Sequence, residues 1–241
     1  MERIIHRAKG GAYPENTLEA IEWAAQTDAD AIEIDVMLSA DGIPVLSHDE
    51  HLKRITSSTK RVGELSVSEL KKLRIRYNGL EKEVIFATLG EAIEVIKGKK
   101  RLYIELKAGS AKSLSESVLN VLDGTLSNDS FVICSFDPNL LSLIKLKRKD
   151  IKTGYIFSNP LRWLTVRYIE RKNGGFDQWL CEKWMMRTDI VEKARSEGKS
   201  LIPWVVNSEK GMKRCIRKGA DGIITDEIGL LNEVMSEQPA D

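Results

Sequence analysis

The feature that most constrains the fold of this chain is a regular alternation of short apolar runs with longer helix-like segments. Eight runs rich in β-branched and other apolar residues are separated by segments whose apolar residues recur at helical spacing. The predicted strands are Arg3–Arg7, Ala31–Val36, Leu102–Lys107, Phe131–Ser135, Thr153–Phe157, Trp179–Glu182, Leu201–Val206 and Gly222–Thr225. The predicted helices include Asn16–Gln26, Gly90–Ile96, Ser113–Leu122, Pro138–Lys147, Asp189–Ser196 and Ser208–Arg217.

This rhythm within 241 residues predicts an α/β fold of the (β/α)₈ TIM-barrel type. A doubly wound open sheet is the alternative, because alternation alone does not show that a sheet closes. Pro44–His48 is an additional strand, and it follows a turn at Asp41-Gly42 that is typical of hairpins. Residues from about 49 to 83 then depart from the rhythm. We therefore expect a single domain over residues 1–241, with a short insertion at about 49–83 after the hairpin.

The composition excludes several classes of protein. Apolar residues make up 42% of the chain, and 37 basic residues balance 36 acidic ones, so neither disorder nor nucleic-acid binding is favoured. The three cysteines, Cys134, Cys181 and Cys215, show no spacing typical of a zinc site or a disulfide framework. No apolar stretch has the length of a signal-peptide core or a transmembrane helix. We expect a cytoplasmic protein with reduced cysteines.

Ionisable side chains collect at the C-terminal ends of the predicted strands, where the functional residues of barrel enzymes lie. They are His6, Arg7, Glu33, Asp35, His48, Glu105 and Lys107. Glu33 and Asp35 are two residues apart on one strand, so both point to the same face. Charges inside such apolar runs are costly unless they are paired or bind a metal. Three carboxylates at one mouth would suit a hard cation, Mg²⁺ or Ca²⁺. The alternative is a buried salt-bridge network formed by the acids with Lys107.

The sequence resembles the glycerophosphodiester phosphodiesterases along essentially the whole chain, and its motifs occur in the same order as in that family. The matching residues are His6-Arg7, Pro14-Glu15-Asn16-Thr17, Ile32-Glu33-Ile34-Asp35-Val36, Asp41-Gly42, His48-Asp49, Glu105-Leu106-Lys107, Ser135-Phe136-Asp137, Trp204-Val205-Val206-Asn207 and Gly222-Ile223-Ile224-Thr225-Asp226. The family's fold is a β/α barrel with an inserted segment after the His-Asp strand. The resemblance therefore implies the same fold that the strand rhythm predicts.

The resemblance also implies roles for individual residues. Glu33, Asp35 and Glu105 match metal ligands, and His6 and His48 match a general acid and base pair whose division of labour stays open. Arg7 and Lys107 match phosphate-binding groups, and Trp204 matches a wall of the substrate pocket, with Phe136 as a weaker candidate. Glu15 is either part of the site or an acid placed at a helix N-terminus. Asn207 and Asp226 either begin helices or contact substrate.

The implied reaction is metal-dependent hydrolysis of a glycerophosphodiester to an alcohol and sn-glycerol 3-phosphate. A lysophospholipase D-type activity on lysophospholipids is the nearest alternative. A phosphate-binding barrel without turnover is a third hypothesis, and the intact histidine pair argues against it. We expect a small-molecule substrate and no nucleic-acid partner. One departure from the family concerns Ala8, where the family has glycine, and another concerns Ile228, which replaces a common proline.

The apolar residues of the segment from Leu161 to Ile169 recur at helical spacing, and this helix has two interpretations. Its spacing predicts that Leu161, Leu164 and Tyr168 face the core and that Trp163 lies outside this stripe. An exposed Trp163 beside arginines would suit peripheral contact with a membrane or contact with a partner subunit. A helix that simply covers the barrel is the favoured interpretation.

Overall fold

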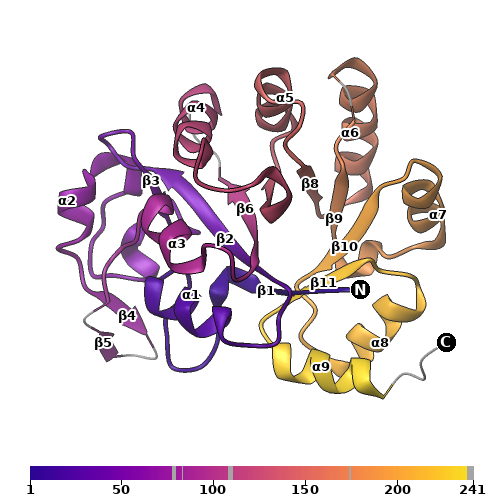
Figure 1. The fold of residues 1–241 in the computed structure, drawn as a ribbon, viewed down its shortest axis with the longest axis horizontal. Helices are drawn as coiled ribbons and strands as arrows, with labels where there is room; N and C mark the ends of the chain where they lie inside the picture. The colour runs from indigo at the N-terminus through magenta and orange to yellow at the C-terminus, as the bar shows by residue number, and fades with distance from the viewer. Residues whose placement is uncertain (78–79, 83, 108–110, 174, 238–241) are drawn as a thin grey trace.

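Parallel strands form the wall of a barrel in the computed structural model (Figure 1), and the pairing of eight wall strands among the described residues confirms the predicted (β/α)₈ fold. The structure describes all residues except 78–79, 83, 108–110, 174 and 238–241. The wall strands are β1 (Glu2–Ile5), β2 (Ala31–Leu38), β6 (Arg101–Leu106), β7 (Phe131–Ser135), β8 (Thr153–Phe157), β9 (Gln178–Glu182), β10 (Ser200–Trp204) and β11 (Gly222–Thr225). They pair in the order β10, β9, β8, β7, β6, β2, β1, β11.

The two ends of this sheet meet between β10 and β11. The Asp221 backbone N donates to Leu201 O at 3.0 Å, and the Val206 N donates to Ile224 O at 3.0 Å. The Asp221 carboxylate adds a third contact, because its Oδ2 accepts from the Leu201 N at 2.8 Å. These bonds close the barrel, which decides against the open doubly wound sheet.

Side chains alternate between the inside and the outside of the barrel, because successive residues of a strand point to opposite faces. The inside is filled by a separate apolar cluster of Ile4, Ala31, Tyr103, Val132, Cys134, Ile156, Leu180, Ile202 and Ile224. The outside carries the larger core, against which the helices pack. These helices are α1 (Leu18–Ala25), α3 (Leu89–Ile96), α4 (Ala111–Leu122), α5 (Pro138–Lys147), α6 (Pro160–Asn173), α7 (Thr188–Ser196), α8 (Glu209–Arg217) and α9 (Ile228–Ser236).

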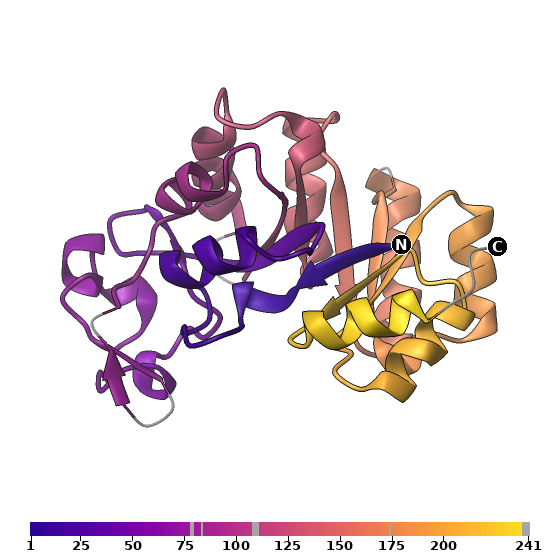
Figure 2. The same cartoon turned by 60° about the horizontal axis from the view of Figure 1, so that its bottom comes forward.

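The predicted insertion follows β3 (Pro44–Leu46), which pairs antiparallel with the end of β2. The segment contains short 3₁₀ helices, η2 (Leu52–Arg54) and η3 (Val62–Glu64), then α2 (Val67–Leu70) and the hairpin β4 (Ile75–Tyr77)–β5 (Leu80–Lys82). It lies at one side of the barrel in Figures 1 and 2, with α2 and the β4–β5 hairpin farthest out. The strand rhythm of the sequence did not predict the β4–β5 pair.

The insertion has an apolar core of its own, which includes Leu52, Val62, Leu70 and Phe86. This core buries most of the large apolar side chains of the segment against each other and against Met37 of β2. The insertion is therefore packed onto the barrel rim beside the end of β2, where the strand ends carry the predicted site.

The prediction for α6 was wrong about which face is buried. Leu161, Leu164 and Tyr168 are 75%, 57% and 61% exposed, whereas Trp163 packs edge-on against Trp179 with ring centroids 6.0 Å apart. The buried face also carries ion pairs, since Arg167 Nη1 lies 2.7 Å from Glu197 and Glu170 Oε1 lies 2.7 Å from Lys199. Because these charges are paired, the inward face is not the most apolar one, and apolar spacing alone misassigns it.

Cys134, Cys181 and Cys215 are buried and free. Within the described part of the chain, no helix combines the length and the apolar character needed to cross a membrane.

Candidate active site

Three buried carboxylates meet at the C-terminal end of β2 and β6. Asp35 and Glu105 are register partners on these adjacent strands, and Glu33 lies two residues before Asp35 on the same face. One carboxylate oxygen from each of the three residues lies within 4.8 Å of the others. The sequence predicted this convergence, and the structure brings the three acids together.

Two cations and an amide hold the central acid, Asp35. Lys107 Nζ lies 2.8 Å from Asp35 Oδ1 and also contacts Glu105, while Arg7 Nε lies 3.3 Å from Asp35 Oδ2. Asn16 donates through Nδ2 to Asp35 Oδ2 at 2.8 Å, and its Oδ1 accepts from the Asp35 backbone N. Burial disfavours the Asp35 carboxylate, but Lys107 and Arg7 outweigh burial and lower its pKa. Asp35 is therefore an anion in this site.

The negative charges of Glu33 and Glu105 are less well compensated by neighbouring groups than that of Asp35. Burial, together with the charges of Asp35 and Glu105, raises the pKa of Glu33 well above its usual value. Burial and Asp35 raise the pKa of Glu105 to about 7. Glu33 Oε2 accepts a hydrogen bond from the Arg7 backbone N at 2.8 Å, but the buried Glu33 Oε1 has no partner among the described residues. A buried oxygen without a partner costs free energy, so a cation bound beside Glu33 Oε1 would stabilise the cluster.

The donor set fits a divalent cation. Hard ions such as Mg²⁺ and Ca²⁺ take oxygen ligands, and a cation among these acids would supply the partner that Glu33 Oε1 lacks. Lys107 and Arg7 provide two positive charges against three carboxylates, which leaves a formal charge of −1 in the buried cluster if all three acids are ionised. The predicted salt-bridge network therefore exists, but it does not balance the acids.

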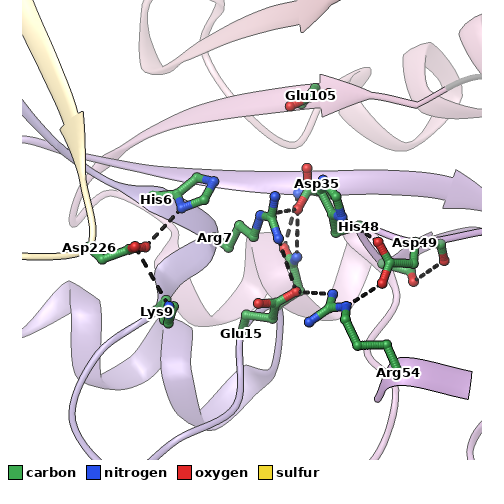
Figure 3. Close-up of polar contacts among 12 residues, drawn as sticks. His6, Arg7, Lys9, Glu15, Asp35, His48, Asp49, Arg54, Glu105 and Asp226 are labelled. Carbon is green, nitrogen blue, oxygen red and sulfur yellow. Dashed lines mark hydrogen bonds and ion pairs between the residues drawn. The ribbon is translucent and has the colours of Figure 1, made fainter. Parts of the chain in front are cut away.

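The two predicted histidines lie near the cluster, and each uses its Nδ1 to contact an aspartate (Figure 3). His6 Nδ1 lies 2.8 Å from Asp226 Oδ1, and His48 Nδ1 lies 2.6 Å from Asp49 Oδ1. Burial lowers the pKa of His48, against the opposing charge of Asp35. Because Nδ1 is engaged in both rings, Nε2 is the nitrogen left for chemistry.

A chain of charged side chains links the insertion to this site. Glu15 Oε1 accepts from Arg7 Nη1 at 3.3 Å and from Arg54 Nη2 at 2.6 Å. Arg54 belongs to η2 of the insertion, and its Nε also bonds to Asp49, the partner of His48. Figure 3 shows the path from Arg7 through Glu15 and Arg54 to Asp49. Glu15 is thus part of the site and does not act as a simple helix-end acid, since α1 begins at Leu18 with Thr17 as its cap.

The backbone around Arg7 is unusual. Arg7 and Ala8 have positive φ angles of 52° and 53°, in the left-handed region that non-glycine residues rarely adopt. The bond from the Arg7 N to Glu33 and a bond from the Asn16 N to Arg7 O at 2.9 Å hold this turn. Ala8 thus takes the conformation that a glycine favours. Gly10 serves packing instead, because a Cβ there would lie 1.9 Å from the Trp23 ring.

Ala8→Gly is expected to change the free energy of unfolding by less than about 1 kcal/mol. Glycine relieves the left-handed backbone, worth about 1–2 kcal/mol. Loss of the buried methyl group costs about 0.8 kcal/mol, and the freer unfolded chain costs about 0.4–1 kcal/mol. Urea unfolding of both proteins measures the balance. Ala8→Val is the control and should destabilise by more than about 2 kcal/mol, since branching is poorly tolerated at positive φ. A loss above 2 kcal/mol in Ala8→Gly would contradict this account.

Two aromatic side chains lie at the C-terminal ends of β7 and β10. Phe136 follows β7 and Trp204 ends β10, and their rings meet edge-on with centroids 5.6 Å apart. Both pack on the apolar cluster inside the barrel, and the Arg162 guanidinium lies 5.9 Å from the Phe136 centroid. The buried Trp204 Nε1 has no partner among the described residues. Trp204 ends β10, so it lies at the same end of the barrel as the acids.

The sequence offered two roles for Asn207 and Asp226, which could either begin the following helices or contact substrate. Neither residue caps a helix in the structure, because Ser208 caps α8 and Glu227 is the residue before α9. Asp226 instead contacts His6, and Asn207 contacts Asp226. A signal for Asp226 was present in the sequence, since it lies two residues after Ile224, whose side chain points into the barrel.

Comparison with known proteins agrees with this arrangement. The sequence profile of the glycerophosphoryl diester phosphodiesterase family matches residues 6–230. A glycerophosphodiester phosphodiesterase of Caldanaerobacter subterraneus subsp. tengcongensis is 30% identical over 232 residues, which cover 93% of each chain. Glycerophosphodiester phosphodiesterase 1 of Bos taurus is 31% identical over 239 residues, covering 85% of this chain and 71% of that one.

Solved structures share the fold. An Oleispira antarctica phosphodiesterase, solved in complex with the product sn-glycerol-3-phosphate, superposes with a TM-score of 0.87 at 25% identity, covering 98% of this chain and 97% of that one. A glycerophosphodiester phosphodiesterase from Thermotoga maritima superposes with a TM-score of 0.80 at 28% identity, with 96% and 97% covered. These findings confirm the resemblance seen in the sequence. The chain is therefore an enzyme of the glycerophosphoryl diester phosphodiesterase family.

Proposed function

We propose that this enzyme hydrolyses glycerophosphodiesters to an alcohol and sn-glycerol 3-phosphate, with one divalent cation, Mg²⁺ or Ca²⁺, held by Glu33, Asp35 and Glu105. The observation that carries the metal assignment is the buried Glu33 Oε1, which has no partner among the described residues although it lies beside two other acids. The product bound to the Oleispira antarctica phosphodiesterase supports the assignment of sn-glycerol 3-phosphate as a product.

Arg7 and Lys107 are proposed to bind the phosphate of the substrate. Their side chains are mostly buried, at 18% and 12% exposure, and both already contact Asp35. A guanidinium offers paired donors to a phosphate, and an ammonium adds a compact charge. When bound, the cation would polarise the phosphoryl oxygens and stabilise their developing charge. Their contacts with Asp35 hold both side chains beside the acid cluster.

His6 and His48 are proposed to move the protons of the reaction. One removes a proton from the attacking oxygen, and the other returns a proton to the leaving alkoxide. Both rings have their Nδ1 engaged by an aspartate, so each presents Nε2 as the reactive atom. Trp204, with Phe136, is proposed as a wall of the substrate pocket at the same end of the barrel as the acids.

Water-soluble diesters are proposed as substrates in preference to lysophospholipids. The insertion packs its larger apolar side chains into its own core, which supports a polar rim beside the site. We also propose that residues 1–241 form a single domain that includes the 49–83 insertion. A cytoplasmic location is proposed because the three cysteines are free and buried.

EDTA is expected to reduce hydrolysis of glycerophosphocholine, glycerophosphoethanolamine and glycerophosphoglycerol at least about 10³-fold, because the cation supplies several kcal/mol of transition-state stabilisation. Adding back Mg²⁺, Ca²⁺ or Mn²⁺ should restore it. Release of sn-glycerol 3-phosphate is measured with a coupled assay. Lysophosphatidylcholine is the fourth substrate, and faster turnover of it would favour the lysophospholipase D activity. If none of the substrates is hydrolysed with any of these ions, the proposed function is refuted. Hydrolysis that EDTA does not inhibit would refute the proposed metal dependence.

A further inference from the structure

Three side chains form a hydrogen-bonded chain across the seam where the barrel closes. Asn207 follows β10, Asp226 follows β11 and His6 follows β1, so the chain joins the ends of three wall strands. Asn207 Nδ2 donates to Asp226 Oδ2 at 2.7 Å, and Asp226 Oδ1 lies 2.8 Å from His6 Nδ1. Asn207 Oδ1 also accepts from the Asp226 backbone N at 2.9 Å and from Thr225 Oγ1 at 3.1 Å.

This arrangement leaves Asp226 little freedom. Asn207 fixes both the backbone and the carboxylate of Asp226, and Lys9 Nζ lies 3.6 Å from Asp226 Oδ2. Oδ1 is thereby left for the His6 ring. Figure 3 shows Asp226 on one side of His6 and Arg7 with Asp35 on the other. Neither Asn207 nor Asp226 caps a helix, so a role in starting the following helices does not explain them.

We propose that Asp226 is the positioning residue for His6, that it holds His6 in the tautomer with the proton on Nδ1, and that Asn207 in turn holds Asp226. This inference rests on the proposed role of His6 in proton transfer. A carboxylate only accepts hydrogen bonds, so the short contact requires Nδ1 to carry the proton. In the neutral ring Nε2 then has a free lone pair.

The contact between His6 and Asp226 also stabilises the imidazole ring when the ring becomes positively charged. When Nε2 takes a proton from its reaction partner, the positive charge of the imidazolium lies beside the Asp226 carboxylate, and loss of that proton restores the neutral tautomer. Asp226 keeps its negative charge throughout. Burial opposes its ionisation, but the hydrogen bond and charge of His6 lower the pKa of Asp226 to about 2. The aspartate therefore orients and stabilises the ring without exchanging a proton.

Asp226→Asn is expected to lower kcat for a glycerophosphodiester about 10²–10⁴-fold with KM changed less than about threefold, because the amide can stabilise the wrong tautomer. The tautomer is read directly from the imidazole ¹⁵N resonances. The chain contains only three histidines, so His6→Gln assigns the His6 signals without ambiguity. We expect the Nδ1-protonated form in the wild type and a shift toward the Nε2-protonated form in Asp226→Asn. Asn207→Ala, which loosens Asp226, should lower kcat about tenfold.

Asp221→Asn is the matched control. Asp221 also bridges β10 and β11 through its carboxylate, at the other end of the seam, by accepting from the Leu201 N. It should lower stability with kcat within about twofold of the wild type. If Asp226→Asn keeps its kcat within threefold, or if the His6 tautomer is unchanged, the proposal is overturned. Should Asp226→Asn fail to fold, an unchanged kcat in Asn207→Ala overturns it instead. Inactive wild-type enzyme would refute the proposed function, while the tautomer measurement would still test Asp226.

Discussion

Glu33→Gln is expected to lower kcat/KM for glycerophosphodiesters by about 10³-fold or more and to make the metal-free protein more stable. The activity is lost because one of three carboxylate ligands is removed, and the cation contributes several kcal/mol to transition-state stabilisation. The fold is retained because the new amide oxygen can still accept the hydrogen bond that Glu33 receives from the Arg7 N. The steady-state rate with saturating Mg²⁺ or Ca²⁺ measures the first effect.

The gain in stability follows from the pKa of Glu33. Burial, with Asp35 and Glu105 nearby, raises this pKa in the folded protein. A carboxyl group with a higher pKa in the folded state than in the unfolded state lowers stability as the pH rises above the unfolded value. At neutral pH the variant is therefore expected to gain about 1 kcal/mol or more in free energy of unfolding, or about 2–4 °C in Tm.

Bound metal should instead make the wild type more stable than Glu33→Gln. A ligand at 100 times its Kd stabilises the folded state by about 2.7 kcal/mol, and the wild type should gain this while Glu33→Gln gains much less. Thermal unfolding with EDTA and with added metal measures both states. Glu50→Gln is the control, because Glu50 is an exposed acid paired with Arg61. Wild-type activity in Glu33→Gln, or equal stabilisation of the two proteins by metal, would contradict the assignment of Glu33 as a ligand.

His48→Ala is expected to lower kcat about 10²–10⁴-fold, the usual contribution of a general acid or base. The loss should appear in kcat more than in KM, since Arg7 and Lys107 remain to bind the phosphate. Stability should change little, because His48 is partly exposed and its Nδ1 contacts a neighbouring aspartate that Arg54 also holds. Steady-state kinetics on one glycerophosphodiester, with thermal unfolding as a check of folding, measures both.

His51→Ala provides a matched control three residues away. His51 is exposed and immediately precedes η2. Its removal should leave kcat within about twofold of the wild type. If both variants lose activity equally, the effect comes from the insertion as a whole, and the specific role of His48 is refuted.

The barrel and most of the acid cluster could be predicted from the sequence, because both depend on short-range periodicity. The strands Phe131–Ser135, Thr153–Phe157 and Gly222–Thr225 were predicted at their observed bounds. Glu33 and Asp35 share a face in any strand, and parallel strands end at the same edge. Once β2 and β6 are neighbours, Asp35 and Glu105 must meet.

Other features depended on contacts between residues far apart in the chain. Asp226 and His6 are separated by 220 positions, and Arg54 reaches Glu15 across 39, so no local pattern joins them. The buried face of α6 was misassigned for a related reason. Arg167 and Glu170 are tolerated there because Glu197 and Lys199 of other segments neutralise them.

The sequence by itself determined which residues lie on strands, which of them point into the barrel, and that three acids and two histidines gather at one mouth. The reason is that side-chain direction in a strand has a period of two residues. Only the tertiary structure decided how the charges are partnered. Whether a buried charge is satisfied depends on groups brought together by barrel closure. That closure places Asp226 against His6, sets Lys107 against Asp35, and leaves Glu33 Oε1 without a partner among the described residues.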